Sequence, residues 1–269
     1  MLGLTFRSKH SYNDFGLIMK SDNRNLLPPL RKRKLTISGK DGTWDFGGGS
    51  YEERQIQVTF ELLAQNRAEL RYKARKVAQW LNSKDGPSNL IFDDEKDKYY
   101  IASVYNGVDL QEIVNNGKFS VVFECQPIAK LIYNADDIIL DSDILLDYTD
   151  VRLGDTYSYT VTNPSNIEIN NFGTYSVRPI IIVHGTWSNF SITIAGKTLN
   201  YTEATTTLGD IIIDNENYTV KDGEGGNKLG VVTGDVNTFL ELPPGINQVT
   251  IDGENLNCTV SFEFAPSYL

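Results

Sequence analysis

The sequence predicts a mainly β protein with two domains: an α+β domain that contains one packed helix, followed by a β-sandwich. Residues 54–62 alternate strictly between apolar and polar side chains, and a single helical segment comes next. The second half holds only short apolar runs separated by turn residues. The length of 269 residues suits two domains, and 40% apolar residues is ordinary for a globular chain.

The first element is the long alternating strand. Ile56, Val58, Phe60 and Leu62 fall on one face, with polar residues between them. This period of two is typical of a half-buried strand. The glycine- and aspartate-rich turns within residues 37–51 precede the strand, and we interpret them as determining shape, because they offer no catalytic arrangement.

One amphipathic helix, about residues 66–82, follows the strand. Asn66 is placed as its N-cap, and Glu69 is placed to reach back to the Asn66 amide. Residues 84–87 end the helix, because proline cannot continue it. Residues at helical spacing form an apolar and a basic face: Leu70, Ala74, Val77 and Leu81 against Arg67, Arg71, Lys73, Arg75 and Lys76.

Two further alternating strands complete the first domain. Tyr100, Ala102 and Val104 alternate in one, and residues 119–125 alternate in the other. The connection from residue 106 to residue 117 is long for a hairpin. We expect a loop of this length to carry a function or to be ordered by a partner.

The second half has the pattern of a β-sandwich. Short apolar or alternating runs are separated by turns rich in Gly, Asn and Asp, as in sandwiches. The runs lie at residues 180–183, 190–194, 211–213, 239–242, 246–251 and 260–264.

Charge separates the two halves. Residues 1–135 hold 20 Lys and Arg against 16 Asp and Glu, a net charge of +4, and residues 136–269 hold 5 against 19, a net charge of −14. This asymmetry supports a boundary near residue 134. We expect the second half to repel nucleic acids and anionic wall polymers.

The two cysteines, Cys125 and Cys258, fall on alternating apolar strands in different predicted domains. Free buried thiols are the favoured interpretation, because free cysteine behaves as a small hydrophobe and assembly in a cytosol disfavours disulfides. A disulfide between the domains is the alternative.

Catalytic and metal-binding motifs lack their required settings. His10 and His184 have no plausible Cys or Ser partner nearby in the sequence, so a catalytic triad would have to be assembled from distant parts of the chain. Residues 93–97 lack the ligand spacing of a calcium loop, so we interpret them as a solvated turn. Residues 223–228 lack the spacing of a phosphate-binding loop, so we interpret them as a flexible hairpin loop. We therefore predict a protein without enzymatic activity, cofactor or metal.

Membrane and secretion signals are not expected either. No apolar stretch approaches the roughly 20 residues that a spanning helix needs, and the first residues lack the pattern of a signal peptide. We expect synthesis and assembly in the cytoplasm, with no membrane insertion.

The dense basic run Arg31-Lys32-Arg33-Lys34 follows two prolines. Binding of nucleic acid or another anionic surface is one interpretation. A solvated strand edge is the other, because no aromatic residues interleave with the four charges.

Three aromatic residues of the second half, Trp187, Tyr201 and Tyr218, have two interpretations. Core packing is favoured, because aromatic side chains bury large areas in sandwiches. Stacking on sugar rings is the alternative.

Several segments occur in the order found in the distal tail proteins (Dit) of long-tailed bacteriophages that infect Gram-positive hosts, and the chain resembles this family. Residues 3–127 carry most of the resemblance, residues 234–268 resemble the closing strands of the family's second domain, and residues 134–235 match loosely. The matching segments are 11–17 (SYNDFGL), 38–42 (SGKDG), 51–62, 77–81 (VAQWL), 90–94 (LIFDD), 99–102 (YYIA) and 117–127 (GKFSVVFECQP).

The resemblance implies a virion structural protein at the tail tip or baseplate. It implies a homohexameric ring built by an N-terminal domain, residues 1–133, with residues 134–269 forming a sandwich similar to galectins and carbohydrate-binding modules. The implied partners are the tail tube (major tail) protein, a tail-associated lysin or fibre protein, and receptor-binding or baseplate proteins, with DNA only passing through the lumen.

The resemblance also implies an extended hairpin, about residues 22–50, that belts neighbouring subunits together. Its implied subunit contacts are Arg31, Lys32, Arg33, Lys34, Lys40, Asp41 and Trp44. In a ring, the basic groups of this segment would alternatively line the lumen. The competing hypothesis is a host-surface carbohydrate-binding module on the tail tip, which would use Trp187, Tyr201 and Tyr218 for sugar stacking.

Overall fold

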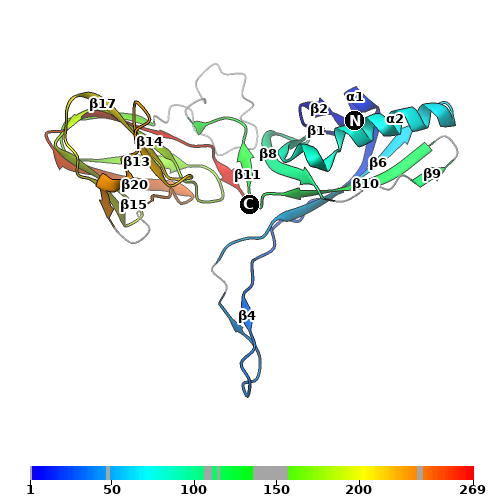
Figure 1. Ribbon diagram of the computed structural model, residues 1–269, viewed down its shortest axis with the longest axis horizontal. Helices are drawn as coiled ribbons and strands as arrows, with labels where there is room; N and C mark the ends of the chain where they lie inside the picture. Colours follow the sequence, from blue (N-terminus) through cyan, green and yellow to red (C-terminus); the bar gives the residue numbers. More distant parts are fainter. Residues whose placement is uncertain (1, 47–48, 106–110, 114–115, 136–156, 235–238) are drawn as a thin grey trace. The chain divides into compact units, whose positions relative to one another are not determined.

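The computed structural model describes residues 2–46, 49–105, 111–113, 116–135, 157–234 and 239–269. The chain divides into two compact units, Met1–Lys130 together with Leu269, and Leu131–Tyr268. Both units are built mainly of strands (Figure 1). The domain limits 1–133 and 134–269 stay a prediction about which segments fold independently.

The first unit is an antiparallel sheet with the strand order β2-β1-β7-β8-β10-β6-β3. Strand β9 pairs with β10 next to the end of β6, and β11 (Ala129–Leu131) follows β10 in the chain. The bounds are β1 (Leu4–Phe6), β2 (Lys9–His10), β3 (Leu17–Asn23), β6 (Arg54–Leu63), β7 (Ser88–Phe92), β8 (Glu95–Val104), β9 (Gln111–Ile113) and β10 (Asn116–Cys125).

Strands β6 and β10 form the centre of this sheet. Val58 lies opposite Val121 and Phe60 lies opposite Phe119, and all four side chains are buried. The predicted alternation is therefore confirmed. The connection 106–117, predicted as a loop, contains β9, which pairs with β10; its residues 106–110 and 114–115 lie outside the described residues.

Helix α2 (Arg67–Trp80) lies against the sheet (Figure 1). The Oδ1 atom of Asn66 accepts a hydrogen bond from the Glu69 amide at 2.9 Å, as the capping pattern predicts. The Glu69 carboxylate, however, accepts from the Gln65 amide at 2.9 Å, so the predicted bond to the Asn66 amide is wrong by one residue. The backbone at Asn66 is extended, and this places the preceding amide within reach of the Glu69 carboxylate.

Aromatic packing fixes the C-terminal end of α2. The Trp80 indole donates a hydrogen bond from Nε1 to the Phe6 carbonyl at 2.9 Å and stacks on Phe15 at 4.6 Å between ring centroids. Phe15 ends helix α1 (Ser11–Phe15). The Arg7 guanidinium donates to the carbonyl groups of Trp80, Asn82 and Gly86, so it satisfies free acceptors where α2 ends and the 3₁₀ helix η1 (Ser83–Asp85) follows.

The second unit is a sandwich of two five-stranded antiparallel sheets, as predicted. One sheet has the order β12-β21-β14-β17-β18, and the other has the order β13-β20-β15-β16-β19. The bounds are β12 (Ser158–Val161), β13 (Ser165–Asn171), β14 (Ile180–Trp187), β15 (Asn189–Ile194), β16 (Lys197–Tyr201), β17 (Thr205–Asp214), β18 (Thr219–Asp222), β19 (Val232–Gly234), β20 (Gly245–Glu254) and β21 (Asn257–Glu263), with η3 (Leu229–Val231) and β22 (Ser267–Tyr268) outside this order.

Apolar side chains from both sheets fill the sandwich, among them Ile181 and Val183 from one sheet and Ile192 and Ile251 from the other. Ile246, which belongs to a predicted apolar run, is exposed. The reason is strand alternation: Asn247, Val249 and Ile251 occupy the buried face of β20, which places Ile246 on the outer face.

Both cysteines are buried and free, which confirms the free-thiol interpretation. Burial raises the pKa of the Cys125 thiol to about 12 and also raises the pKa of Cys258. No helix among the described residues is long and apolar enough to cross a bilayer.

Candidate functional site: an exposed hairpin arm

The segment from Arg24 to Glu53, hereafter the arm, leaves the sheet of the first unit as an extended hairpin between β3 and β6 (Figure 1). Near its root, Leu30 and Tyr51 form a bridge, and the Arg31 amide donates to the Ser50 carbonyl at 2.8 Å. Further out, β4 (Lys34–Leu35) pairs with β5 (Trp44–Asp45). Residues 47 and 48 lie outside the described residues.

The outer part of the arm is an amphipathic ribbon. Leu35 lies opposite Trp44, and Lys34 lies opposite Asp45. Because successive side chains of a strand point to opposite faces, Leu35, Trp44 and Phe46 share one face, and Lys34 and Asp45 share the other. The three apolar side chains are each more than half exposed. One face of the ribbon therefore presents apolar surface to solvent.

The root of the arm carries a second apolar group. Leu26, Leu27 and Leu30 are 87%, 60% and 47% exposed. Contiguous exposed apolar surface is characteristic of interaction sites, and an isolated two-stranded hairpin is at best marginally stable in water. The arm thus has the physical character of a segment that another surface covers.

The predicted contact residues occupy this arm. The basic run (Arg31, Lys32, Arg33 and Lys34) lies between the two apolar groups, and all four side chains are exposed. Within the described part of the chain, none of the four forms an ion pair. Lys40 and Asp41 lie in the turn at the tip, and the Lys40 ammonium lies 4.4 Å from the centre of the Trp44 ring.

Two arginines that the sequence analysis did not single out hold the root of the arm. Arg54 is buried and donates from Nη1 to the Asn25 carbonyl at 3.0 Å. Arg24 donates to carboxylates of Asp22, Asp94 and Glu95, with Nε 2.6 Å from Asp22 Oδ2 and Nη1 3.2 Å from Glu95 Oε2. The acidic turn after β7 therefore connects β7 to β8 and also binds Arg24 at the root of the arm. The sequence did contain a signal for Arg54: it is in phase with the apolar residues of β6, which predicts that its side chain lies on the core face.

A groove lies at the root of the arm, with a volume of about 620 Å³. Three carboxylates line it, and we call it the acidic groove. Partial desolvation, followed by the neighbouring Glu53 carboxylate, raises the pKa of Glu124. Its lining residues are Arg31, Tyr51, Glu52, Glu53, Gln55, Glu124, Gln126 and Pro127.

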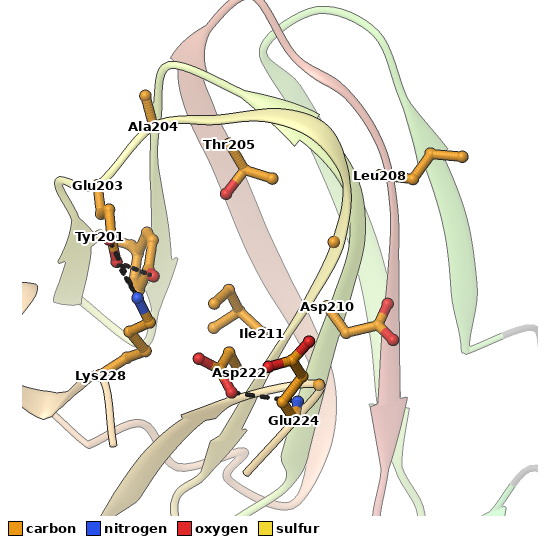
Figure 2. A pocket seen from close by; sticks show the side chains of 12 residues that line it. Tyr201, Glu203, Ala204, Thr205, Leu208, Asp210, Ile211, Asp222, Glu224 and Lys228 are labelled. Atoms are coloured by element: carbon orange, nitrogen blue, oxygen red, sulfur yellow. Dashed lines mark hydrogen bonds and ion pairs between the residues drawn. The ribbon is translucent and has the colours of Figure 1, made fainter. Parts of the chain in front are cut away.

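A second cavity, of about 400 Å³, lies in the second unit (Figure 2). Two of its charged residues, Lys228 and Glu203, form an ion pair. The Lys228 ammonium lies 2.9 Å from Glu203 Oε2, the Tyr201 hydroxyl donates to the same carboxylate at 3.0 Å, and these two contacts lower the pKa of Glu203. Asp222 accepts from the amide of Glu224 at 3.1 Å and from the amide of Gly226 at 2.7 Å. The predicted flexible loop 223–228 is therefore held by its own hydrogen bonds.

The three aromatic residues considered for sugar stacking separate into two groups. Trp187 and Tyr201 are 2% and 1% exposed and pack around Phe190, so they belong to the core and present no ring face to a ligand. Tyr218 is half exposed, and its ring lies 5.0 Å from the Arg178 guanidinium. The structure thus does not bring the three together as one platform.

The two histidines have structural partners in place of catalytic ones. His10 Nδ1 accepts from the amides of Tyr12 and Asn13 and caps α1, and its Nε2 lies 3.1 Å from Asp93 Oδ2. His184 contacts Asp210. Neither histidine has a Ser or Cys among its hydrogen-bond partners in the described ranges.

Comparison with known proteins agrees with this architecture. Residues 14–125 match the phage tail protein RIFT-related domain family. The crystal structure of phage SPP1 Dit, described as a paradigm of the hub adsorption apparatus in phages that infect Gram-positive bacteria, is similar over 100% of both chains, with a TM-score of 0.72 and 15% identity. The phage p2 baseplate in its activated conformation with Sr matches over 98% of both chains, with a TM-score of 0.39 and 12% identity. No curated protein matches.

The match of residues 14–125 covers the sheet strands β3, β6, β7, β8 and β10, helix α2 and the arm between β3 and β6. The likeness to SPP1 Dit extends through the second unit as well. Residues 14–125 therefore resemble the phage tail protein RIFT-related domain family, and the chain shares the fold of SPP1 Dit over its whole length.

Proposed function

We propose that this protein is the structural hub at the distal end of a phage tail, where it joins the tail tube to the proteins of the tail tip or baseplate. The observation that carries the proposal is the arm, which exposes two apolar groups and a basic run next to a folded sheet. A segment of this kind is stable when it lies on another subunit. The whole-length likeness to SPP1 Dit supports the same assignment.

In this proposal six copies form a ring through the domain of residues 1–133, and the sandwich of residues 134–269 projects outward. Each arm contacts a neighbouring copy through a surface different from its own, so the contact is head-to-tail. Such contacts give a closed ring when the rotation between copies closes, and a filament otherwise. A permanent interface of this type buries on the order of 2,000 Å² or more.

The proposed partners are the tail tube protein on one face of the ring and a tail-associated lysin, fibre, baseplate or receptor-binding protein on the other. DNA passes through the lumen in this arrangement. The role is structural, and the proposal assigns no reaction to the chain.

Light scattering and negative-stain microscopy of the full-length protein, alone and mixed with its tail partners, test the proposal. We expect closed six-membered rings. A protein that stays monomeric at tens of micromolar, with the partner proteins present, would rule out a ring-forming hub.

A further inference from the structure

His10 is the N-cap residue of helix α1 and binds the helix through its ring. The Nδ1 atom accepts hydrogen bonds from the amides of Tyr12 and Asn13, at 3.2 and 3.1 Å. The Asp14 carboxylate accepts from the His10 amide at 2.6 Å, so the first turn of α1 is bound in both directions. Asparagine, aspartate, serine and threonine are the usual caps, and histidine differs from them because its charge changes between about pH 5 and 8.

These bonds determine where the proton of the neutral ring lies. A ring nitrogen that accepts from two amides carries no hydrogen, so the proton is on Nε2. This atom lies 3.2 Å from Oδ1 and 3.1 Å from Oδ2 of Asp93, and it donates to that carboxylate. The neutral ring of His10 thus joins α1 to the turn between β7 and β8.

The backbone of the first strand and several charged groups surround the ring. The Asp93 amide donates to the Gly3 carbonyl at 3.1 Å, and a Cβ atom at Gly3 would lie 2.9 Å from Cε1 of the ring. The His10 side chain is 19% exposed. Its charged neighbours are the carboxylates of Asp93 and Asp14 and the adjacent residue of β2, Lys9. The carboxylates favour a positive charge on the ring, whereas the amides of α1 oppose it.

A second proton on the ring is incompatible with the cap. An imidazolium donates from both nitrogen atoms and accepts at neither. Its Nδ1–H group would face the N–H groups of Tyr12 and Asn13, and a positive charge is unfavourable at a helix N-terminus. The bond to Asp93 becomes stronger on protonation, because both of its partners are then charged. Protonation therefore breaks one attachment of the ring and strengthens the other.

We propose that His10 is an acid-sensitive clasp: the neutral ring holds the first turn of α1, and the protonated ring stays with Asp93 and releases that turn. The open form takes up a proton that the capped form does not bind, so opening becomes more favourable as the pH falls. The released turn carries Tyr12, whose side chain is 44% exposed, so the surface around α1 changes. This inference is independent of the proposed hub function.

Hydrogen exchange of the full-length protein, read at single residues by mass spectrometry with electron-transfer fragmentation, tests the clasp. We expect the protection factors of the Tyr12 and Asn13 amides to fall at least about tenfold between about pH 7.5 and pH 5, after correction for intrinsic exchange, while those of α2 stay constant. His10→Asn should remove this change, because an asparagine side chain caps at either pH. His184→Asn replaces the other histidine and should behave like the wild type.

Constant protection of Tyr12 and Asn13 in the wild type would overturn the inference. An equal fall in His10→Asn would do so too, because it would trace the change to other groups. Asp93→Asn supplies a second readout: loss of the carboxylate disfavours the imidazolium, so the midpoint of opening should shift downward by at least about half a pH unit. An unchanged midpoint would show that Asp93 does not hold the protonated ring, and the clasp as proposed would be wrong.

Discussion

The guanidinium of Arg54 donates a hydrogen bond from Nη1 to the backbone carbonyl of Asn25, with an N–O distance of 3.0 Å. Arg54 begins the central strand β6, and Asn25 lies at the start of the arm. This bond joins strand β6 of the sheet to the exposed arm. It fixes where the arm leaves the sheet, and the arm is the segment on which the proposed assembly depends.

Replacing Arg54 with methionine should free the root of the arm with little effect on the core. Methionine keeps the apolar stem and removes a buried charge, so the free energy of unfolding should change by no more than about 1 kcal/mol. Loss of the bond to Asn25 should, however, make trypsin cleave the basic run faster than in the wild type. Equal cleavage rates would mean that Arg54 does not hold the arm.

Replacing Val77 with aspartate should unfold the first unit and leave the second unit folded. Val77 is 4% exposed on the buried face of α2, and an unpaired buried carboxylate costs several kcal/mol. Calorimetry should show the loss of one transition and the retention of the other. Ala78→Asp, on the exposed face of the same helix, is the matched control and should keep both transitions. Simultaneous loss of both transitions in Val77→Asp would contradict independent folding of the two units.

Replacing Arg31, Lys32, Arg33 and Lys34 together with serine should weaken ring assembly more than domain stability. All four are exposed, and single exposed charges contribute only about 0–1 kcal/mol, so the quadruple change is needed. Sedimentation velocity at low and high salt should show that screening loosens the same contacts. Normal rings combined with weaker DNA binding would move these residues from the subunit contact to the lumen.

The Cys125 thiol should resist modification in the native protein and react after denaturation. Burial raises its pKa to about 12, so the thiolate is scarce at pH 8. The pKa of Cys125 is higher in the folded protein than in the unfolded chain, where it is near 9. The stabilisation from the neutral thiol is therefore complete below pH 9 and is lost as the pH rises from 9 toward 12. In the Cys125→Ala variant, the free energy of unfolding should decrease less steeply between pH 9 and pH 12 than in the wild type. Rapid native labelling at pH 8 would contradict the buried position.

The isolated second unit should bind no sugar on a glycan array, because Trp187 and Tyr201 have no ring face available. Trp187→Ala should destabilise this unit by about 3–5 kcal/mol, the usual cost of removing a large core aromatic. Tyr218→Ala, at a half-exposed ring, is the control and should cost much less. A glycan signal that Trp187→Ala removes at unchanged thermal stability would restore the sugar-stacking hypothesis.

Elements with local signals could be predicted from the amino-acid sequence alone. The alternation of Ile56, Val58 and Phe60 specified the core face of β6, since side chains of a strand alternate with a period of two. Asn66 specified the start of α2, because a cap acts within a single turn. The short apolar runs of the second half specified a sandwich, because strand patterns and the turn residues between them are also local signals.

Features that depend on contacts between distant segments became visible in the folded structure and not in the sequence. Periodicity assigns a residue to a face but does not say which strands are neighbours, so the contact of Glu53 with Glu124 was invisible in the sequence. The same holds for Arg24, whose partners Asp94 and Glu95 come from the turn after β7. The burial of Trp187 likewise follows from sheet packing, because its own neighbours in the sequence fit an exposed strand end equally well.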